Sequence, residues 1–165
     1  MATWAEVSSA EPVFAARVRD RFDLHKHKTI ATLRKDGSPR ISGIEATFIG
    51  GDLWFGSMPA ALKALDLRRD PRFALHGPSI DAGQDDPSAW GGDAKLSGLA
   101  VEVTDQAEIA RLFRAMGADP GDHQGSHLFR ADVREVVLTR VGEPADHLVI
   151  ELWREGEDLR RFERA

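Results

Sequence analysis

The chain has 165 residues, a formal charge of −5 and a hydrophobic content of 42%, and it contains no cysteine. This length predicts one domain with a sizeable core, and the lack of cysteine excludes disulfides, thiolate nucleophiles and Cys-ligated metal sites. The acidic balance and the absence of a long apolar run or a signal-like N-terminus predict a cytoplasmic protein that binds neither nucleic acid nor membranes.

Residues 1–28 are expected to form a helix followed by a linker. Ser8 and Glu11 have capping-box spacing, which predicts a helix start at this point. Apolar side chains then recur at four-residue steps, as on the buried face of an amphipathic helix, at Phe14, Val18 and Phe22. The polar residues 25–28 are predicted to be the linker.

Strand patterns dominate the rest of the chain. An Asp-Gly turn signal at Asp36 predicts a hairpin, and short apolar or alternating runs between turn residues predict the other strands. The predicted strands are Thr29–Arg34, Pro39–Ile49, Asp52–Gly56, Arg72–Gly77, Ala94–Thr104, Asp132–Val141 and His147–Trp153. A long loop is predicted over residues 78–93, a helix over 106–116 and a short basic tail over 159–164. This pattern indicates a mainly β protein, an antiparallel Greek-key barrel with peripheral α-helices, with any ligand in an outer groove or a subunit interface.

One stretch, residues 53–71, predicts a phosphate-binding corner. A strand runs into a short helix, Ser57 is placed to cap the first free amides, and Pro59 suits the first helical turn. Lys63 lies one turn further on and is expected to reach back to the joint. A helix N-terminus with a hydroxyl and an ammonium group is a typical phosphate site. The alternative interpretation is a surface helix with a solvated Lys63.

Other polar residues offer weaker signals. Arg40 and Ser42 lie on the strand expected to pair beside Ser57, although a solvent-facing Arg40 fits the pattern equally well. Arg68 and Arg69 at the helix end are explained by the helix dipole alone.

The histidines are predicted to be structural or solvated, and no metal site is predicted. His123 and His127 are four residues apart, but their segment has the composition of a loop. His76 is expected to be partly buried and hydrogen-bonded. Because no nucleophile motif or Gly-rich nucleotide fingerprint is present, no catalytic side chain is assigned.

Three stretches together resemble a known family. They are T-I-A-T-L-R-K-D-G-S-P-R-I-S-G (29–43), L-W-F-G-S-M-P-A-A-L-K (53–63) and R-R-D-P-R-F-A-L (68–75). The C-terminal segments E-L-W (151–153) and R-R-F-E-R (160–164) extend the similarity. In order and spacing the chain resembles the pyridoxamine 5′-phosphate oxidase-like, FMN-binding split-barrel family.

The resemblance implies a homodimer of six-stranded split barrels with FMN in each interface cleft. It implies a phosphate held by Ser57 and Lys63, although Leu62 stands where the family often has a second basic residue. The cofactor-binding residues it implies, with the last two supplied by the partner chain, are Arg40, Ile41, Ser42, Gly43, Ser57, Lys63, Trp153 and Arg164.

The resemblance also bears on the reaction. Arg160 matches a substrate-binding arginine of the true oxidases, but Phe162 stands where their histidine would be, which argues against pyridoxamine-phosphate oxidation. The expected function is an FMN-dependent oxidoreductase acting on a small molecule, with a deazaflavin (F420)-dependent reductase as the alternative, since the cofactor carries the chemistry in both. Two functions without turnover also fit the sequence: a flavin- or haem-binding protein, with His76 as the haem ligand, and a plain dimeric scaffold.

Overall fold

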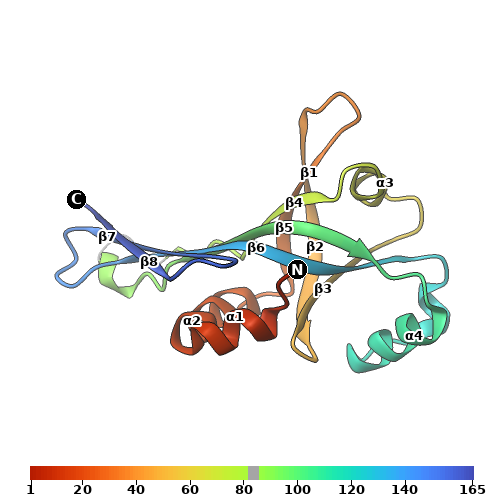
Figure 1. Cartoon of the computed structure of the whole chain (residues 1–165), viewed down its shortest axis with the longest axis horizontal. Helices are drawn as coiled ribbons and strands as arrows, with labels where there is room; N and C mark the ends of the chain where they lie inside the picture. Colours follow the sequence, from red (N-terminus) through yellow and green to blue (C-terminus); the bar gives the residue numbers. More distant parts are fainter. Residues whose placement is uncertain (82–85) are drawn as a thin grey trace.

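A closed six-stranded antiparallel barrel forms the centre of the protein (Figure 1). The computed structural model describes residues 1–81 and 86–165. Its strands are β1 (His27–Leu33), β2 (Pro39–Ile49), β3 (Asp52–Ser57), β4 (Arg72–His76), β5 (Asp93–Glu102), β6 (His127–Val141), β7 (Leu148–Arg154) and β8 (Arg160–Arg164). The order is β3-β2-β1-β4-β5-β6, and pairing of β3 with β6 closes the ring. The predicted six-stranded split barrel is confirmed.

Strand β6 belongs to two parts of the sheet. Its first residues pair with β3 from His127 to Arg130, and its second half pairs with β7 from Glu135 to Val141. Strands β7 and β8 therefore extend beyond the barrel as an arm, which carries the C-terminus on the left of Figure 1. A bulge in β6 at Arg134, opposite Ser97 and Gly98 of β5, accompanies this change, and a Cβ on Gly98 would overlap the Asp132 carbonyl oxygen.

Two helices, not one, open the chain. They are α1 (Trp4–Ala10) and α2 (Pro12–Asp23). The capping box joins Thr3 and Glu6, so its predicted location at Ser8 and Glu11 is wrong. Glu11 is non-helical (φ −136°, ψ 71°) because proline disfavours a helical residue before it, and Pro12 then starts the second helix.

The helices cover different parts of the barrel. Helices α1 and α2 lie against one face of the sheet, α3 (Leu62–Arg69) lies beside β1, and α4 (Gln106–Ala115) follows β5. Trp4 and Phe22 pack against Phe48, with ring centroids 4.6 and 5.9 Å apart, in the main core. Leu112 of α4 forms a second cluster with Trp54 and Leu128. None of the helices in the described ranges is long and apolar enough to cross a membrane.

Several boundaries differ from prediction. Strand β1 begins at His27, inside the expected linker, and the expected basic tail is β8, which pairs with β7 from Arg160 to Arg164. The predicted loop over 78–93 includes residues 82–85, which lie outside the described residues; its later part contains a 3₁₀ turn at Pro87–Ala89, and β5 begins at Asp93. A second 3₁₀ turn, Pro120–His123, precedes β6.

Candidate functional site

The end of β3 carries a buried hydroxyl group that no described residue hydrogen-bonds. Ser57 is the last residue of β3 and lies opposite His127 of β6. Its Oγ is buried, and it has no hydrogen-bond partner among the described residues. Because buried polar groups are nearly always hydrogen-bonded, this oxygen is suited to an incoming ligand.

The connection from β3 to α3 differs from the predicted one. Helix α3 begins at Leu62 with Ala61 as its N-cap, and within the described part of the chain no side chain caps it. Ser57 and Pro59 precede the helix, so the prediction that they form its cap and first turn is wrong. The reason is a turn at Ala60, whose φ of 58° reverses the chain before the helix starts. The free amides of α3 remain available to an anion.

Lys63 lies beside the same end of the sheet. Its Nζ donates a hydrogen bond of 2.6 Å to the carbonyl oxygen of Gly43 on β2. The β2–β3 register pairs Glu45 with Gly56, which places Gly43 just beyond the end of β3. Burial lowers the pKa of Lys63. The bond to the Gly43 carbonyl oxygen uses only one of the three N–H donors of Lys63, so the ammonium group is able to bind an anion as well.

Arg40 is held by a buried carboxylate that the sequence interpretation missed. Asp66 of α3 is 3% exposed and accepts from Arg40 Nε at 2.6 Å, from Thr32 Oγ1 at 2.9 Å and from Arg69 Nη2 at 3.0 Å. Burial raises the pKa of Asp66, but the hydrogen bonds from these three donors outweigh it, so the net pKa is lowered. Arg40 therefore fixes α3 to the barrel through Nε, and its side chain is only 21% exposed.

The neighbouring residues of β2 form an open surface. Ile41 is 75% exposed, and a Cβ on Gly43 would meet nothing within 4 Å. Ser42 is half-buried and alternates with them along the strand. Ile41 and Gly43 therefore leave this face of β2 open, next to the carbonyl group that Lys63 binds.

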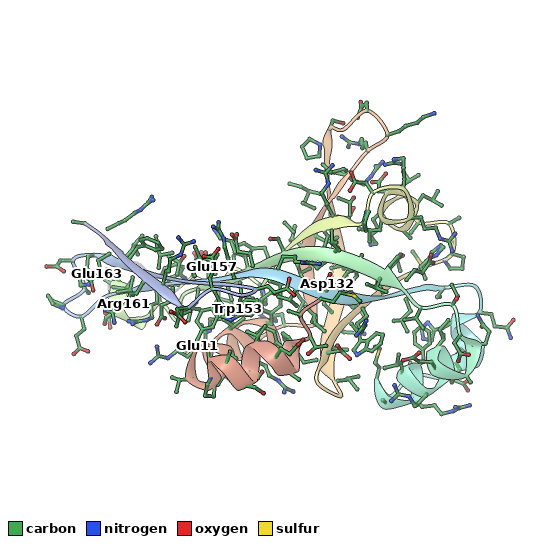
Figure 2. The ribbon with its side chains drawn as sticks, viewed as in Figure 1. Glu11, Asp132, Trp153, Glu157, Arg161 and Glu163 are labelled. Carbon is green, nitrogen blue, oxygen red and sulfur yellow. The ribbon has the colours of Figure 1, made fainter. Side chains whose placement is uncertain are left out.

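The predicted C-terminal residues lie on the arm and not at this corner. Trp153 is 5% exposed and belongs to the main core, whereas Arg164 is exposed on β8. Arg160 pairs with Glu157 at 3.3 Å. Figure 2 places Trp153, Glu157 and the β8 residues along the arm, away from α3. Within one chain, the structure does not bring these residues to Ser57 and Lys63.

The histidines have separate partners. His76 Nδ1 contacts the Gly77 carbonyl oxygen at 2.6 Å, and its Nε2 lies 3.9 Å from Asp93. His123 stacks on Phe113 with centroids 4.4 Å apart. His127 contacts Glu102. In residues 1–81 and 86–165 no three potential ligand side chains gather in a metal-binding group.

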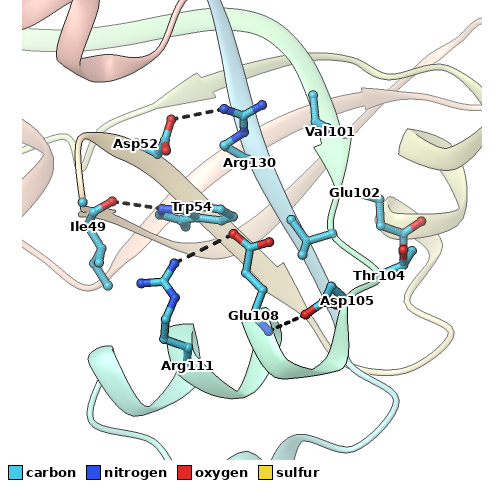
Figure 3. A pocket seen from close by; sticks show the side chains of 12 residues that line it. Ile49, Asp52, Trp54, Val101, Glu102, Thr104, Asp105, Glu108, Arg111 and Arg130 are labelled. Atoms are coloured by element: carbon cyan, nitrogen blue, oxygen red, sulfur yellow. Dashed lines mark hydrogen bonds and ion pairs between the residues drawn. The ribbon is translucent and has the colours of Figure 1, made fainter.

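A groove of about 450 Å³ lies between α4 and strands β3, β5 and β6 (Figure 3). Two ion pairs lie in it: Asp52 with Arg130 at 3.6 Å, and Glu108 with Arg111 at 3.8 Å. Burial raises the pKa of Asp52. None of the predicted cofactor residues lines this groove, so the candidate site remains the corner formed by Ser57, Lys63 and the turn between them, which we call the phosphate corner.

The closed barrel, with a hydroxyl group and a lysine at the bend after its third strand, defines a protein of the split-barrel class. A family model described as pyridoxamine 5′-phosphate oxidase matches residues 14–141. The chain belongs to this family.

Solved structures show the same fold at low sequence identity. A pyridoxamine 5′-phosphate oxidase-related, FMN-binding protein from Nostoc punctiforme has a TM-score of 0.64 and 13% identity, over 100% of this chain and 98% of the other. A conserved hypothetical protein from Mycobacterium tuberculosis has a TM-score of 0.60 and 21% identity, over 73% and 81%. A protein described as an F420 reductase has a TM-score of 0.53 and 18% identity, over 72% and 94%. No curated protein matches this sequence.

Proposed function

We propose that the protein is an FMN-dependent oxidoreductase that binds the cofactor phosphate at the phosphate corner and works as a homodimer. The observation that carries this proposal is the buried Oγ of Ser57, which has no hydrogen-bond partner among the described residues, at the end of the sheet where Lys63 binds the Gly43 carbonyl oxygen. An oxyanion would accept from both groups, and charge-assisted hydrogen bonds of this kind are the strong ones. The FMN-binding description of the Nostoc relative supports the choice of cofactor.

The isoalloxazine ring is assigned to the β2 segment Ile41, Ser42 and Gly43, on the open face that Ile41 and Gly43 form. Backbone amide groups along this strand would stabilise negative charge on a reduced ring. In the proposed dimer the exposed Arg164 on β8 is available to the neighbouring copy, whereas Trp153 is buried in the core of its own chain. When bound, the flavin supplies the hydride chemistry, and the protein supplies position and charge.

The alternative cofactor is F420, which also offers a phosphate group and a flat tricyclic ring. One solved structure with the same fold is described as an F420 reductase, so F420 is included in the binding experiments below. The proposed substrate is a small molecule. Phe162, where a histidine would hold pyridoxamine phosphate, argues against that substrate.

The purified protein should be yellow, with an absorption band near about 450 nm if FMN is bound. Mass spectrometry of the released small molecule separates FMN, F420 and haem. Lys63→Ala should weaken FMN binding about 10- to 100-fold, since a hydrogen bond to a charged group contributes about 1.5–3 kcal/mol. Lys35→Ala removes the same charge from the exposed β1–β2 turn and should leave the affinity unchanged.

Equal affinities for these two variants would rule out the phosphate corner. Sedimentation analysis tests the dimer, and a monomer at micromolar concentration would contradict the proposed interface. Reduction of the bound cofactor by NAD(P)H or reduced F420, followed by reoxidation with a panel of acceptors, separates an enzyme from a cofactor-binding protein without turnover.

A further inference from the structure

A buried histidine contacts the turn that separates Ser57 from α3. We propose that His127 is a positioning residue that holds the Ala60 turn, and with it the phosphate corner, in the shape that binds phosphate. This inference rests on the proposed function, because it concerns how the same corner is kept ready for its ligand.

The hydrogen bonds of His127 fix its tautomer. Its Nε2 lies 3.3 Å from the backbone nitrogen of Ala60, and its Nδ1 lies 3.1 Å from Oε1 of Glu102. A backbone amide group only donates, so Nε2 must carry the lone pair and Nδ1 the proton. The neutral ring therefore accepts from the Ala60 N–H and donates to Glu102. At 7% exposure, His127 exchanges neither partner freely for water.

Glu102 is itself held in place from α3. Arg68 donates a bidentate pair of hydrogen bonds to the Glu102 carboxylate, from Nε to Oε2 at 2.8 Å and from Nη2 to Oε1 at 2.7 Å. These hydrogen bonds lower the pKa of Glu102. In Figure 3 Glu102 lies at the end of β5, apart from the Glu108–Arg111 pair. The chain of contacts thus runs from Arg68 through Glu102 and His127 back to the turn that precedes the same helix.

The Ala60 turn needs such support. Ala60 has a φ of 58° and is the only non-glycine residue with a positive φ in the described ranges. An alanine in this region is strained, so the conformation persists only when its surroundings impose it. The N–H of Ala60 finds its acceptor in His127, and the ring therefore favours the strained turn over a relaxed one.

The same histidine also borders the unsatisfied hydroxyl group. Ser57 and His127 are direct partners in the β3–β6 register, so their side chains lie on the same side of the sheet. Loss of the Ala60 contact would thus change the connection between the Ser57 hydroxyl and the amides of α3. The effect should fall on the phosphate of a ligand and not on its ring.

The first test uses the wild-type protein without a cofactor. In ¹⁵N NMR spectra at neutral pH, His127 should be the neutral tautomer with the proton on Nδ1, and the Ala60 amide should exchange slowly with solvent. A proton on Nε2, or a fast-exchanging Ala60 amide, would overturn the inference without reference to any ligand.

The second test compares FMN with riboflavin, which has the same ring and no phosphate. His127→Phe keeps an aromatic ring without an acceptor and should weaken FMN binding about five- to tenfold, the effect of one lost hydrogen bond, while riboflavin binding stays unchanged. His127→Gln offers the Ala60 amide an acceptor again and should recover FMN affinity.

The outcomes separate the two proposals. If wild-type protein binds FMN and His127→Phe binds it equally well, the positioning role is wrong and the proposed function stands. If His127→Phe weakens FMN and riboflavin alike, the residue is merely structural and the inference also fails. If wild-type protein binds neither FMN nor F420, the proposed function fails, and this inference fails with it.

Discussion

Asp66 connects three elements of the barrel, and its replacement by asparagine is the sharpest test of how α3 is attached. Asp66→Asn keeps the shape of the side chain and removes the charge that Arg40 and Arg69 neutralise. Asp66 is 3% exposed, whereas the side chains of Arg40 and Arg69 are 21% and 38% exposed. Water can therefore replace part of the hydrogen bonding that the two arginines lose, but it cannot reach the buried side chain of residue 66.

The expected cost follows from this difference in exposure. Breaking a fully buried ion pair costs about 3–5 kcal/mol, and the partial exposure of the arginines reduces the expected cost of Asp66→Asn to about 2–3 kcal/mol. With a typical urea dependence of about 2 kcal/mol per molar, the unfolding midpoint should fall by about 1 M. This is a large part of the stability of an ordinary domain.

Urea denaturation followed by tryptophan fluorescence measures the change. The matched control is Asp70→Asn, which removes the same charge from a pair with the exposed Arg72 at 2.6 Å. An exposed ion pair contributes little, so the control should keep the wild-type midpoint. If the midpoints of Asp66→Asn and Asp70→Asn coincide, Asp66 does not hold α3 in the way described.

Two further predictions concern the core and the response to acid. Trp153→Ala should lower the unfolding free energy of the cofactor-free protein by about 3–5 kcal/mol, whereas Trp153→Phe should lower it much less. Urea denaturation measures both changes. An unchanged stability for the alanine variant would show that the tryptophan does not support the core. The pKa of Asp66 is lower in the folded protein than in the unfolded chain, so its stabilisation is complete above the unfolded value near about 4 and is lost as pH falls through the folded value. Denaturation curves from pH 7 to pH 3 should therefore show a steeper loss of stability for wild-type protein than for Asp66→Asn, and parallel losses would contradict this assignment.

The barrel strands were predictable because most of them have one buried and one open face. The expected bounds of β2, Pro39–Ile49, agree with the structure, and its burial alternates as the sequence does. Strand β6 was predicted to start at Asp132 because residues 127–129 are all buried, so the alternation that marks a strand is absent there. Helix α4 and its cluster cover the outer face of this segment, and that contact is not visible in a local pattern.

The placement of Ser57 and Lys63 was predictable in part. The order of Ser57 and Lys63 after a strand indicated the pair, and the structure places both at one end of β2 and β3. The turn at Ala60 was missed because alanine gives no signal for a positive φ. His127 was missed for a different reason. Its partners Glu102 and Ala60 lie far from it in the chain, at separations of 25 and 67 residues.

The continuity of β6 has a mechanical consequence. Its 15 residues form one strand from the closed ring into the arm, and β5 pairs with it from Asp93 to Glu102 on both sides of the bulge at Arg134. To move the β7–β8 hairpin relative to the barrel, β5 and β6 would have to bend together. This bending would break hydrogen bonds between β5 and β6. The β7–β8 hairpin is therefore expected to keep a fixed orientation relative to the barrel. A molecule that binds to the hairpin would be held in that same orientation.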